Sequence, residues 1–256
     1  MISKINENRF QILFRDKQYI SLKNYLYNFL LRKKAVKAAL KGQIVERIIE
    51  IGPGLSPVTR ATADILYTDL SYIGLRSLKD RLNSGNFITA DGTALPFKSN
   101  HFSSCICSEV IEHIENDAKA LHEMARITKS QGTLVLTFPH RRAYYSNDDK
   151  YVNHHRRYNL ADIKKLLIEA GFQPFRIKKV LGPLDKITMI AVIYLITLFN
   201  RNGDEPAESQ KNGYSSPWEM FCFKWLNLFY MILAWVDAKI MPLSMSSVLL
   251  IKSKKI

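Results

Sequence analysis

Short apolar runs alternate with longer amphipathic segments along most of the chain, and several runs end in a turn or an acidic residue. Four to eight apolar residues bounded by turn signals are typical of buried strands. Strands that alternate with helical segments indicate βαβ units and a mostly parallel sheet. We therefore expect an α/β, Rossmann-like doubly wound fold. The predicted strands are residues 48–51, 66–69, 87–91, 102–107, 133–138, 175–181 and 247–252.

Three longer segments have the apolar spacing of helices, which places side chains three and four residues apart on one face. They are residues 20–41, 109–130 and 160–170, and glycines close the first and the last of them. The first predicted helix belongs to a basic N-terminal segment, residues 1–47. We divide the rest into a core, residues 48–182, an insertion, residues 183–245, and a final core strand, residues 246–256.

The insertion is the most apolar part of the chain. Residues 187–199 are almost wholly apolar but are too short for a bilayer, which needs about 20 residues. After a polar linker, residues 200–216, the segment 218–236 is rich in Trp, Tyr and Phe yet contains Lys224 and Asn227. Aromatic rings favour the headgroup interface, so we expect two helices that lie in one leaflet. A lid over the substrate, a homodimer interface and a two-span hairpin are the alternatives.

Charge is distributed unevenly over the 256 residues, whose net charge is +14. Residues 1–47 hold eleven Lys or Arg and three acidic residues, whereas residues 48–139 hold eight and ten. A basic flank attracts anionic phospholipid or nucleic acid. Nucleic acid is the weaker expectation, because the insertion has few charges and the basic residues form no recognised RNA-binding motif. The N-terminus lacks an apolar signal region, so we expect a cytoplasmic protein at the inner face of the membrane.

Cysteine spacing gives no metal or disulfide motif. Cys105 and Cys107 alternate within a predicted strand, and no C-x-x-C pair is present. We interpret them as small buried hydrophobes on one face of the sheet. The adjacent His154 and His155 have no acid or cysteine at ligand spacing, so no metal site is expected.

A glycine turn and two acids point to a cofactor site. The first core strand ends in Glu50-Ile-Gly52-Pro-Gly54, where glycines let the backbone approach a ligand. Asp69 and Asp91 end the next two strands, and the carboxyl ends of parallel strands meet at the ligand-binding edge of such sheets. A carboxylate at Asp69 can accept hydrogen bonds from two ribose hydroxyls.

The order of these motifs resembles the class I S-adenosylmethionine-dependent methyltransferases, particularly the enzymes of ubiquinone and menaquinone biosynthesis. The series continues with Ala-Asp91-Gly-Thr-Ala-Leu-Pro-Phe and Ser108-Glu-Val-Ile-Glu-His-Ile. The resemblance covers residues 48–182 and implies an antiparallel final strand. It departs at Ser56, where the family often has glycine. A Rossmann-type dehydrogenase and a non-catalytic binding module are the alternatives. The implied S-adenosylmethionine site consists of Glu50, Gly52, Gly54, Asp69, Leu70, Asp91, Gly92 and Ser108.

Candidate groups for the methyl acceptor follow the fifth strand. His140 lies where the substrate pocket is expected to open, and His is the usual base near neutral pH. His154, Arg157 and Tyr158 match a signature that resembles methyltransferases of envelope sugars and lipids. The arginine can clamp a phosphate or carboxylate while the histidine takes a proton, or the run is a solvated basic stretch. His113 has either a site role or a structural hydrogen bond.

The sequence thus predicts a methyltransferase of a small, amphiphilic or lipid-linked acceptor at an anionic membrane surface. A nucleic-acid methyltransferase and a soluble enzyme with the insertion as a lid are the alternatives.

Overall fold

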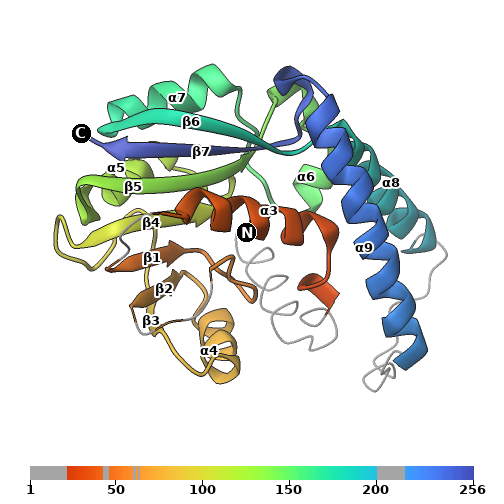
Figure 1. Ribbon diagram of the computed structural model, residues 1–256, viewed down its shortest axis with the longest axis horizontal. Helices are drawn as coiled ribbons and strands as arrows, with labels where there is room; N and C mark the ends of the chain where they lie inside the picture. Colours follow the sequence, from red (N-terminus) through yellow and green to blue (C-terminus); the bar gives the residue numbers. More distant parts are fainter. Residues whose placement is uncertain (1–21, 43–45, 60–61, 63, 201–216) are drawn as a thin grey trace.

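A single seven-stranded sheet with the order β3-β2-β1-β4-β5-β7-β6 organises the molecule (Figure 1). The structure is a computed structural model that describes residues 22–42, 46–59, 62, 64–200 and 217–256. Neighbouring strands from β3 to β5 are parallel, and β7 is antiparallel to both β5 and β6. This confirms the expected fold and the antiparallel final strand. The strands are β1 Ile48–Ile51, β2 Ile65–Asp69, β3 Asn86–Thr89, β4 Phe102–Ser108, β5 Thr128–Pro139, β6 Phe172–Leu181 and β7 Val248–Lys255.

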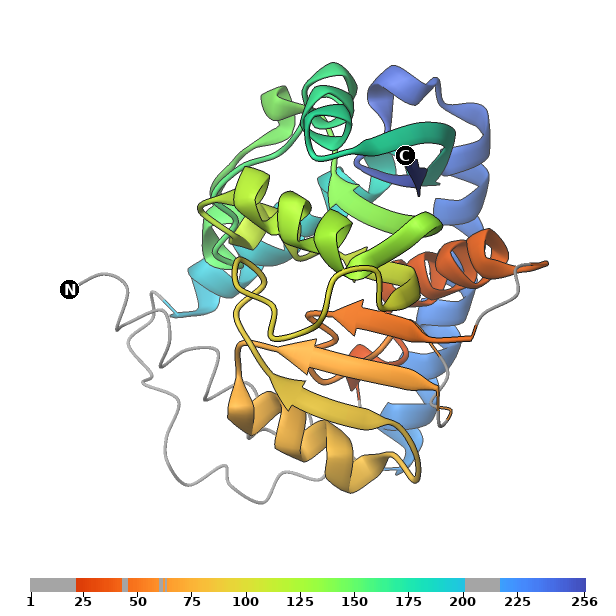
Figure 2. The same ribbon diagram turned by 90° about the vertical axis from the view of Figure 1, so that its left-hand side faces the viewer.

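Helices cover both faces of the sheet, so its central strands are apolar on both sides. Cys105 and Cys107 point into the layer beneath α5 and α7, as the alternation predicts, whereas Ile106 points into the layer beneath α3. Figure 2 shows the two layers on either side of the strands. The helices are α3 Tyr27–Leu40, α4 Tyr72–Arg81, η1 Ile111–His113, α5 Asp117–Ile127, η2 Arg142–Tyr144, α6 Asn147–Tyr151, α7 Leu160–Glu169, α8 Pro183–Asn200, α9 Pro217–Ile240 and η4 Leu243–Met245.

The prediction of one helix over residues 109–130 is wrong. Glu109 has a φ of 54°, which is outside the right-handed helical region, and only the short 3₁₀ helix η1 follows it. Helix α5 begins after Asn116, whose side chain accepts a hydrogen bond from the Lys119 amide at 3.0 Å. Thr128 already belongs to β5. The first predicted helix is also shorter, because α3 begins at Tyr27; residues 20 and 21 lie outside the described residues.

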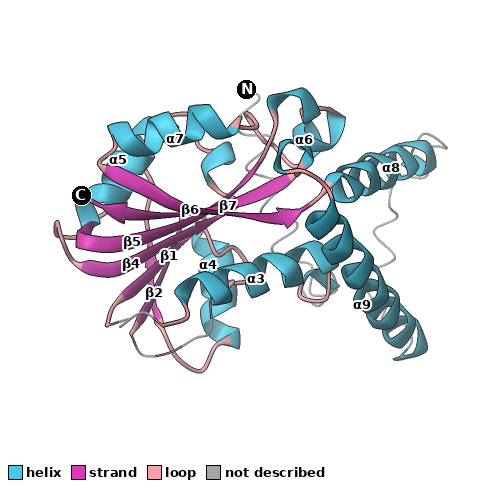
Figure 3. Ribbon diagram, turned by 45° about the horizontal axis from the view of Figure 1, so that its top comes forward, coloured by secondary structure: helices cyan, strands magenta, loops and turns pink. Residues whose placement is uncertain are grey.

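The insertion forms two helices, α8 and α9, between β6 and β7 (Figure 3). Helix α9 packs on the domain through Ala234 and Ala238, which are buried. The ring of Tyr230 lies edge-on to that of Tyr27 in α3, with centroids 4.7 Å apart, and its hydroxyl bonds the Thr188 hydroxyl of α8. The insertion is therefore attached along one side to α3 and β6. The predicted linker, residues 200–216, falls almost wholly outside the described residues.

Candidate functional site

The turn after β1 requires glycine at two positions. Gly52 and Gly54 have φ values of 67° and 52°, in the left-handed region that other residues rarely adopt. A Cβ at Gly52 would also lie 2.8 Å from Cγ1 of Val110. The segment between β4 and α5 therefore packs directly on this turn.

Asp69 links the turn to the next strand. Its carboxylate accepts from the Gly54 amide at 2.9 Å and from the Ser71 amide at 2.9 Å. Burial raises the pKa of Asp69, while these two hydrogen bonds oppose the change. The adjacent Leu70 has 71% of its surface exposed at this edge, and its predicted contact with the cofactor stays a prediction.

Lys23 interacts electrostatically with Asp69, a proximity that the sequence did not indicate. Burial lowers its pKa to about 8, with further lowering by the charges of Arg32 and Arg81 and an opposing effect of Asp69. It thus brings the segment before α3 into the field of the Asp69 carboxylate. A single lysine in a basic segment gives no sequence signal that would separate it from the others.

Glu50 is buried beneath the turn. Its carboxylate accepts from the Val58 amide at 2.7 Å and from the Thr59 amide at 3.1 Å, and it also bonds the Thr59 hydroxyl. Burial raises the pKa of Glu50, and these hydrogen bonds counteract the rise. Glu50 therefore holds the loop that carries Ser56, whose hydroxyl is buried and has no hydrogen-bond partner within the described part of the chain.

The third predicted acid lies two residues beyond β3. Asp91 is exposed and accepts from the Thr93 amide at 2.7 Å, which shapes the loop around Gly92. A Cβ at Gly92 would lie 3.2 Å from Ile114, so this loop also packs on the segment after β4. Ser108, at the end of β4, is 2.8 Å from the Thr137 hydroxyl of β5. The structure therefore brings the predicted cofactor residues to one edge of the sheet.

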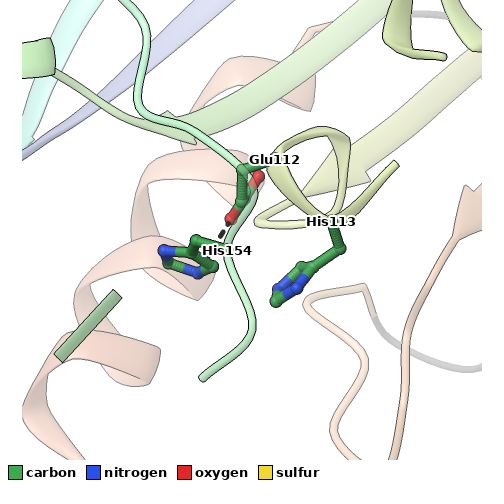
Figure 4. Close-up of side chains that lie close together, drawn as sticks. All are labelled: Glu112, His113 and His154. Atoms are coloured by element: carbon green, nitrogen blue, oxygen red, sulfur yellow. Dashed lines mark ion pairs between the residues drawn. The ribbon is translucent and has the colours of Figure 1, made fainter. Parts of the chain in front are cut away.

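A cluster of Glu112, His113 and His154 lies beside this edge (Figure 4). Their ligand atoms, one from each residue, all lie within 4.8 Å of one another. Burial lowers the pKa of His113 to about 4, with a further contribution from His154. Burial also raises the pKa of Glu112 well above its ordinary value, and the nearby carboxylate of Glu109 adds to the rise.

A buried network of charges joins this cluster to the insertion. The Nδ1 of His154 lies 2.8 Å from Asp149, which also accepts from Arg157 at 2.7 Å and from Lys186 of α8 at 2.8 Å. Lys186 also bonds both oxygens of Asp148, at 2.6 and 2.7 Å.

The remaining predicted acceptor residues lie within hydrogen-bond networks of the fold. His140 is buried, its Nδ1 lies 3.0 Å from the Ser246 carbonyl, and burial lowers its pKa. The hydroxyl of Tyr158 donates to Asp117 at 2.7 Å. Of the four predicted residues, only His154 belongs to the cluster with Glu112 and His113; His140, Arg157 and Tyr158 bond Ser246, Asp149 and Asp117, respectively. Their catalytic roles stay predictions.

Comparison with known proteins identifies this arrangement. Residues 49–136 match the methyltransferase domain family. This part of the chain is therefore a methyltransferase domain of the class I, S-adenosylmethionine-dependent type. The methyltransferase is 34% identical over 95 residues to demethylmenaquinone methyltransferase of Renibacterium salmoninarum, which is 36% of this chain and 40% of that one. It is 30% identical over 108 residues to the enzyme of the same name from Paenarthrobacter aurescens, 41% of this chain and 43% of that one. The match thus spans less than half the length of these relatives.

Solved structures share the fold of the methyltransferase over nearly its whole length. A S-adenosylmethionine-dependent methyltransferase from Thermotoga maritima has a TM-score of 0.60 at 17% identity and covers 96% of this chain and 98% of its own. Phosphoethanolamine N-methyltransferase 2 of Haemonchus contortus, in complex with S-adenosylmethionine, has a TM-score of 0.58 at 16% identity, covering 96% and 60%. At these identities the likeness shows the fold alone.

The cofactor edge fits S-adenosylmethionine. The glycine turn at Gly52 and Gly54, the carboxylate of Asp69 and the Ser56 hydroxyl, which has no hydrogen-bond partner among the described residues, are groups that suit a charged, hydroxyl-bearing ligand. The residues that sequence reasoning missed here are Glu112 and Lys23. Glu112 lies in the quoted Ser-Glu-Val-Ile-Glu-His-Ile motif, so an acid beside a histidine was visible, but its partner His154 is far away in the chain.

Proposed function

We propose that the protein transfers a methyl group from S-adenosylmethionine to a small amphiphilic or lipid-linked acceptor at the surface of an anionic membrane. The observation that carries this proposal is the uncovered apolar surface of α9 and α8. On α9, Trp218, Trp225 and Phe229 are 70%, 57% and 62% exposed. On α8, Ile187 and Tyr194 are both 63% exposed. Such a continuous apolar surface is unusual on a water-facing domain.

The two helices suit an interfacial position better than a span. Residues Met220–Ile240 are long and apolar enough to cross a bilayer by composition, and 11% of that stretch is buried. However, Asn227, Ala234 and Ala238 pack on the domain along the same helix. The Asn227 side chain also accepts from the Tyr27 amide at 3.4 Å. A helix fixed to the domain along its side cannot be surrounded by lipid, whereas its opposite face can enter one leaflet.

The insertion is coupled to the site through the buried network. Lys186, in the first turn of α8, bonds Asp149, and Asp149 bonds His154 beside the cofactor edge. An acceptor held in the lipid interface would therefore approach the domain near the first turn of α8. This supports an acceptor with an apolar part, such as the quinone precursor on which the demethylmenaquinone methyltransferases act by name.

The chemistry divides between cofactor and chain. S-adenosylmethionine supplies an electrophilic methyl group on a sulfonium, so the chain has to align an acceptor and exclude water. Gly52, Gly54 and Asp69 hold the cofactor, while Leu70 gives its ring an apolar contact. Glu112, His113 and His154 face the acceptor. Arg157 and Lys186 keep Asp149 ionised, and Asp149 fixes the ring of His154.

Liposome flotation together with methyl transfer tests this function. The protein should float with anionic vesicles and should label a lipid fraction when it is supplied with radiolabelled S-adenosylmethionine. The double variant Trp225→Glu/Phe229→Glu should stay in the soluble fraction while it binds S-adenosylmethionine as the wild type does. Ile168→Glu is the matched control, because Ile168 is 58% exposed on α7, away from the insertion. It should float normally.

The competing functions give different results in the same experiment. A wild-type protein that stays soluble and sediments as a dimer, with the α9 variant sedimenting as a monomer, would assign α9 to a homodimer interface. Label in the RNA fraction would favour a nucleic-acid methyltransferase. Either outcome would overturn the membrane part of the proposal, and absence of S-adenosylmethionine binding would overturn all of it.

A further inference from the structure

The Glu112, His113 and His154 cluster has the geometry of a metal site. The three residues come from η1 and from the loop after α6, and their rings and carboxylate gather at one point in Figure 4. The imidazole centroids of the two histidines are 4.7 Å apart, and Nε2 of His154 lies 3.6 Å from a carboxylate oxygen of Glu112. A nitrogen and an oxygen that both bind an ion at about 2.0–2.2 Å are separated by such a distance.

The tautomers of both histidines direct Nε2 into the cluster. Nδ1 of His154 lies 2.8 Å from the Asp149 carboxylate, and Nδ1 of His113 lies 3.0 Å from the Asn153 carbonyl. Both partners are acceptors, so each Nδ1 carries a proton, and in the neutral form of either ring the lone pair is on Nε2. Metal-binding histidines are held in this way, with the other ring nitrogen donating to a carboxylate or a backbone carbonyl.

Glu112 supplies the independent observation. Its side chain is fully buried, and neither carboxylate oxygen has a hydrogen-bond partner among the described residues. An oxygen of Glu109, three residues earlier, is also buried and without a partner. The 3.6 Å separation from His154 is too long for a hydrogen bond. Buried carboxylates in proteins are neutral, paired or bound to metals, and these two acids are placed where a cation would satisfy their free oxygens.

We infer that Glu112, His113 and His154 bind a divalent first-row transition-metal ion, such as Zn²⁺ or Mn²⁺, with Glu109 as a neighbouring carboxylate. Two imidazoles and a carboxylate suit these ions better than Mg²⁺, which prefers oxygen ligands. The sequence predicted no metal site, because neither the cysteines nor the adjacent His154 and His155 have ligand spacing along the chain. The fold changes that conclusion by bringing His154 to Glu112 and His113.

The position of the site indicates what the ion does. Val110 packs on the Gly52 turn and Ile114 packs on the Gly92 loop, so η1 lies between the two cofactor loops. The side chain of His154 is 12% exposed, so the cluster reaches solvent through a small part of this ring. On the proposed function, the ion binds an acceptor hydroxyl and lowers its pKa. The hydroxyl proton passes to water, the oxygen–carbon bond forms and the carbon–sulfur bond of the cofactor breaks. The substrate class is therefore a hydroxylated, metal-binding acceptor.

Direct metal binding tests the site without any need for activity. The full chain, dialysed against EDTA, should bind one equivalent of Zn²⁺ in a calorimetric titration, and Co²⁺ should give ligand-field absorption. Glu112→Gln, His113→Ala and His154→Ala should each weaken binding at least tenfold. His155→Ala is the matched control, because His155 is exposed and adjacent but outside the cluster. It should bind as the wild type does.

The outcomes separate this inference from the proposed function. Each variant is first shown to be folded by circular dichroism and by S-adenosylmethionine binding. No metal binding by the wild type, or binding that the three variants leave unchanged, would overturn the metal site. Full methyl transfer in EDTA would overturn the role of the ion but leave the methyltransferase. A wild-type protein that binds Zn²⁺ but not S-adenosylmethionine would overturn the proposed function alone.

Discussion

Replacing Gly52 by alanine tests whether the turn after β1 is constrained both by its backbone and by its neighbour. Gly52 has a φ of 67°, and a left-handed conformation costs a non-glycine residue about 1–2 kcal/mol. The added methyl group would also meet both γ-carbons of Val110, and overpacking of this kind costs about 1–3 kcal/mol. Together, the backbone strain and the overpacking should lower the free energy of unfolding of Gly52→Ala by about 2–5 kcal/mol.

Gly171→Ala separates the two contributions. Gly171 has a φ of 93°, and a Cβ there would have nothing within 4 Å. It should therefore lose only the backbone part, about 1–2 kcal/mol. Val110→Ala in the Gly52→Ala background should restore about 1–3 kcal/mol, because it removes the clash but not the strain. The same change in the wild-type background measures the cost of truncating Val110 itself.

Urea unfolding and calorimetry with S-adenosylmethionine are the assays. In Gly52→Ala the turn can shift and so relieve its strain. If the cofactor binds only the native turn, each 1.4 kcal/mol needed to restore that turn weakens binding about tenfold. Gly171→Ala should bind the cofactor normally. Equal stability losses for Gly52→Ala and Gly171→Ala, with unchanged cofactor affinity in both, would refute the close packing of Val110 as a determinant of the turn.

Other residues give sharp expectations as well. Asp69→Ala removes the carboxylate that accepts hydrogen bonds from the Gly54 and Ser71 amides. Each hydrogen bond to a charged acceptor is worth about 1.5–3 kcal/mol, so the turn should lose its native geometry. Calorimetry should then detect no S-adenosylmethionine binding in a folded protein. Lys186→Met breaks a buried pair with Asp148 and Asp149 and should reduce the free energy of unfolding by about 3–5 kcal/mol; an unchanged urea midpoint would contradict it. His113 has a pKa of about 4 when folded, against about 6.5 when unfolded. Between pH 6.5 and pH 4 the unfolded chain binds a proton at His113 that the folded chain does not bind. The free energy of unfolding should therefore fall by up to about 3 kcal/mol as the pH decreases over this range. In EDTA, His113→Asn should make the free energy of unfolding less dependent on pH over the same range.

The cofactor edge was predictable because its determinants are local. Each strand ends within a few residues of the turn or acid that it positions, so Gly52, Asp69 and Asp91 follow from the chain order. The antiparallel final strand was implied by the resemblance alone. The break at residues 109–116 was missed because its residues favour helices, although Asn116 followed by Asp117 is a helix-start signal.

The cluster and its support were not predictable, because they depend on contacts between distant segments. Lys186 follows Asp185 at the start of an apolar run, and nothing in the sequence identifies Asp148 and Asp149 as its partners. The same holds for His154 and Glu112, which meet only after β5 and α6 have been placed. Local sequence patterns therefore locate the cofactor site, whereas tertiary packing assembles the cluster and the charged network beside it.

The central place of β7 has a consequence for how the chain folds. Strands β5 and β6 both pair with β7, and not with each other, yet β7 follows α8 and α9 in the chain. During synthesis, β5 and β6 therefore emerge with unpaired edges, and the apolar helices emerge next, before the strand that closes the sheet. Open edges beside exposed apolar helices are sites of aggregation. The slow, non-local step of folding is thus the insertion of β7. A nascent chain whose helices have already met a membrane would complete that step with its most aggregation-prone surface shielded.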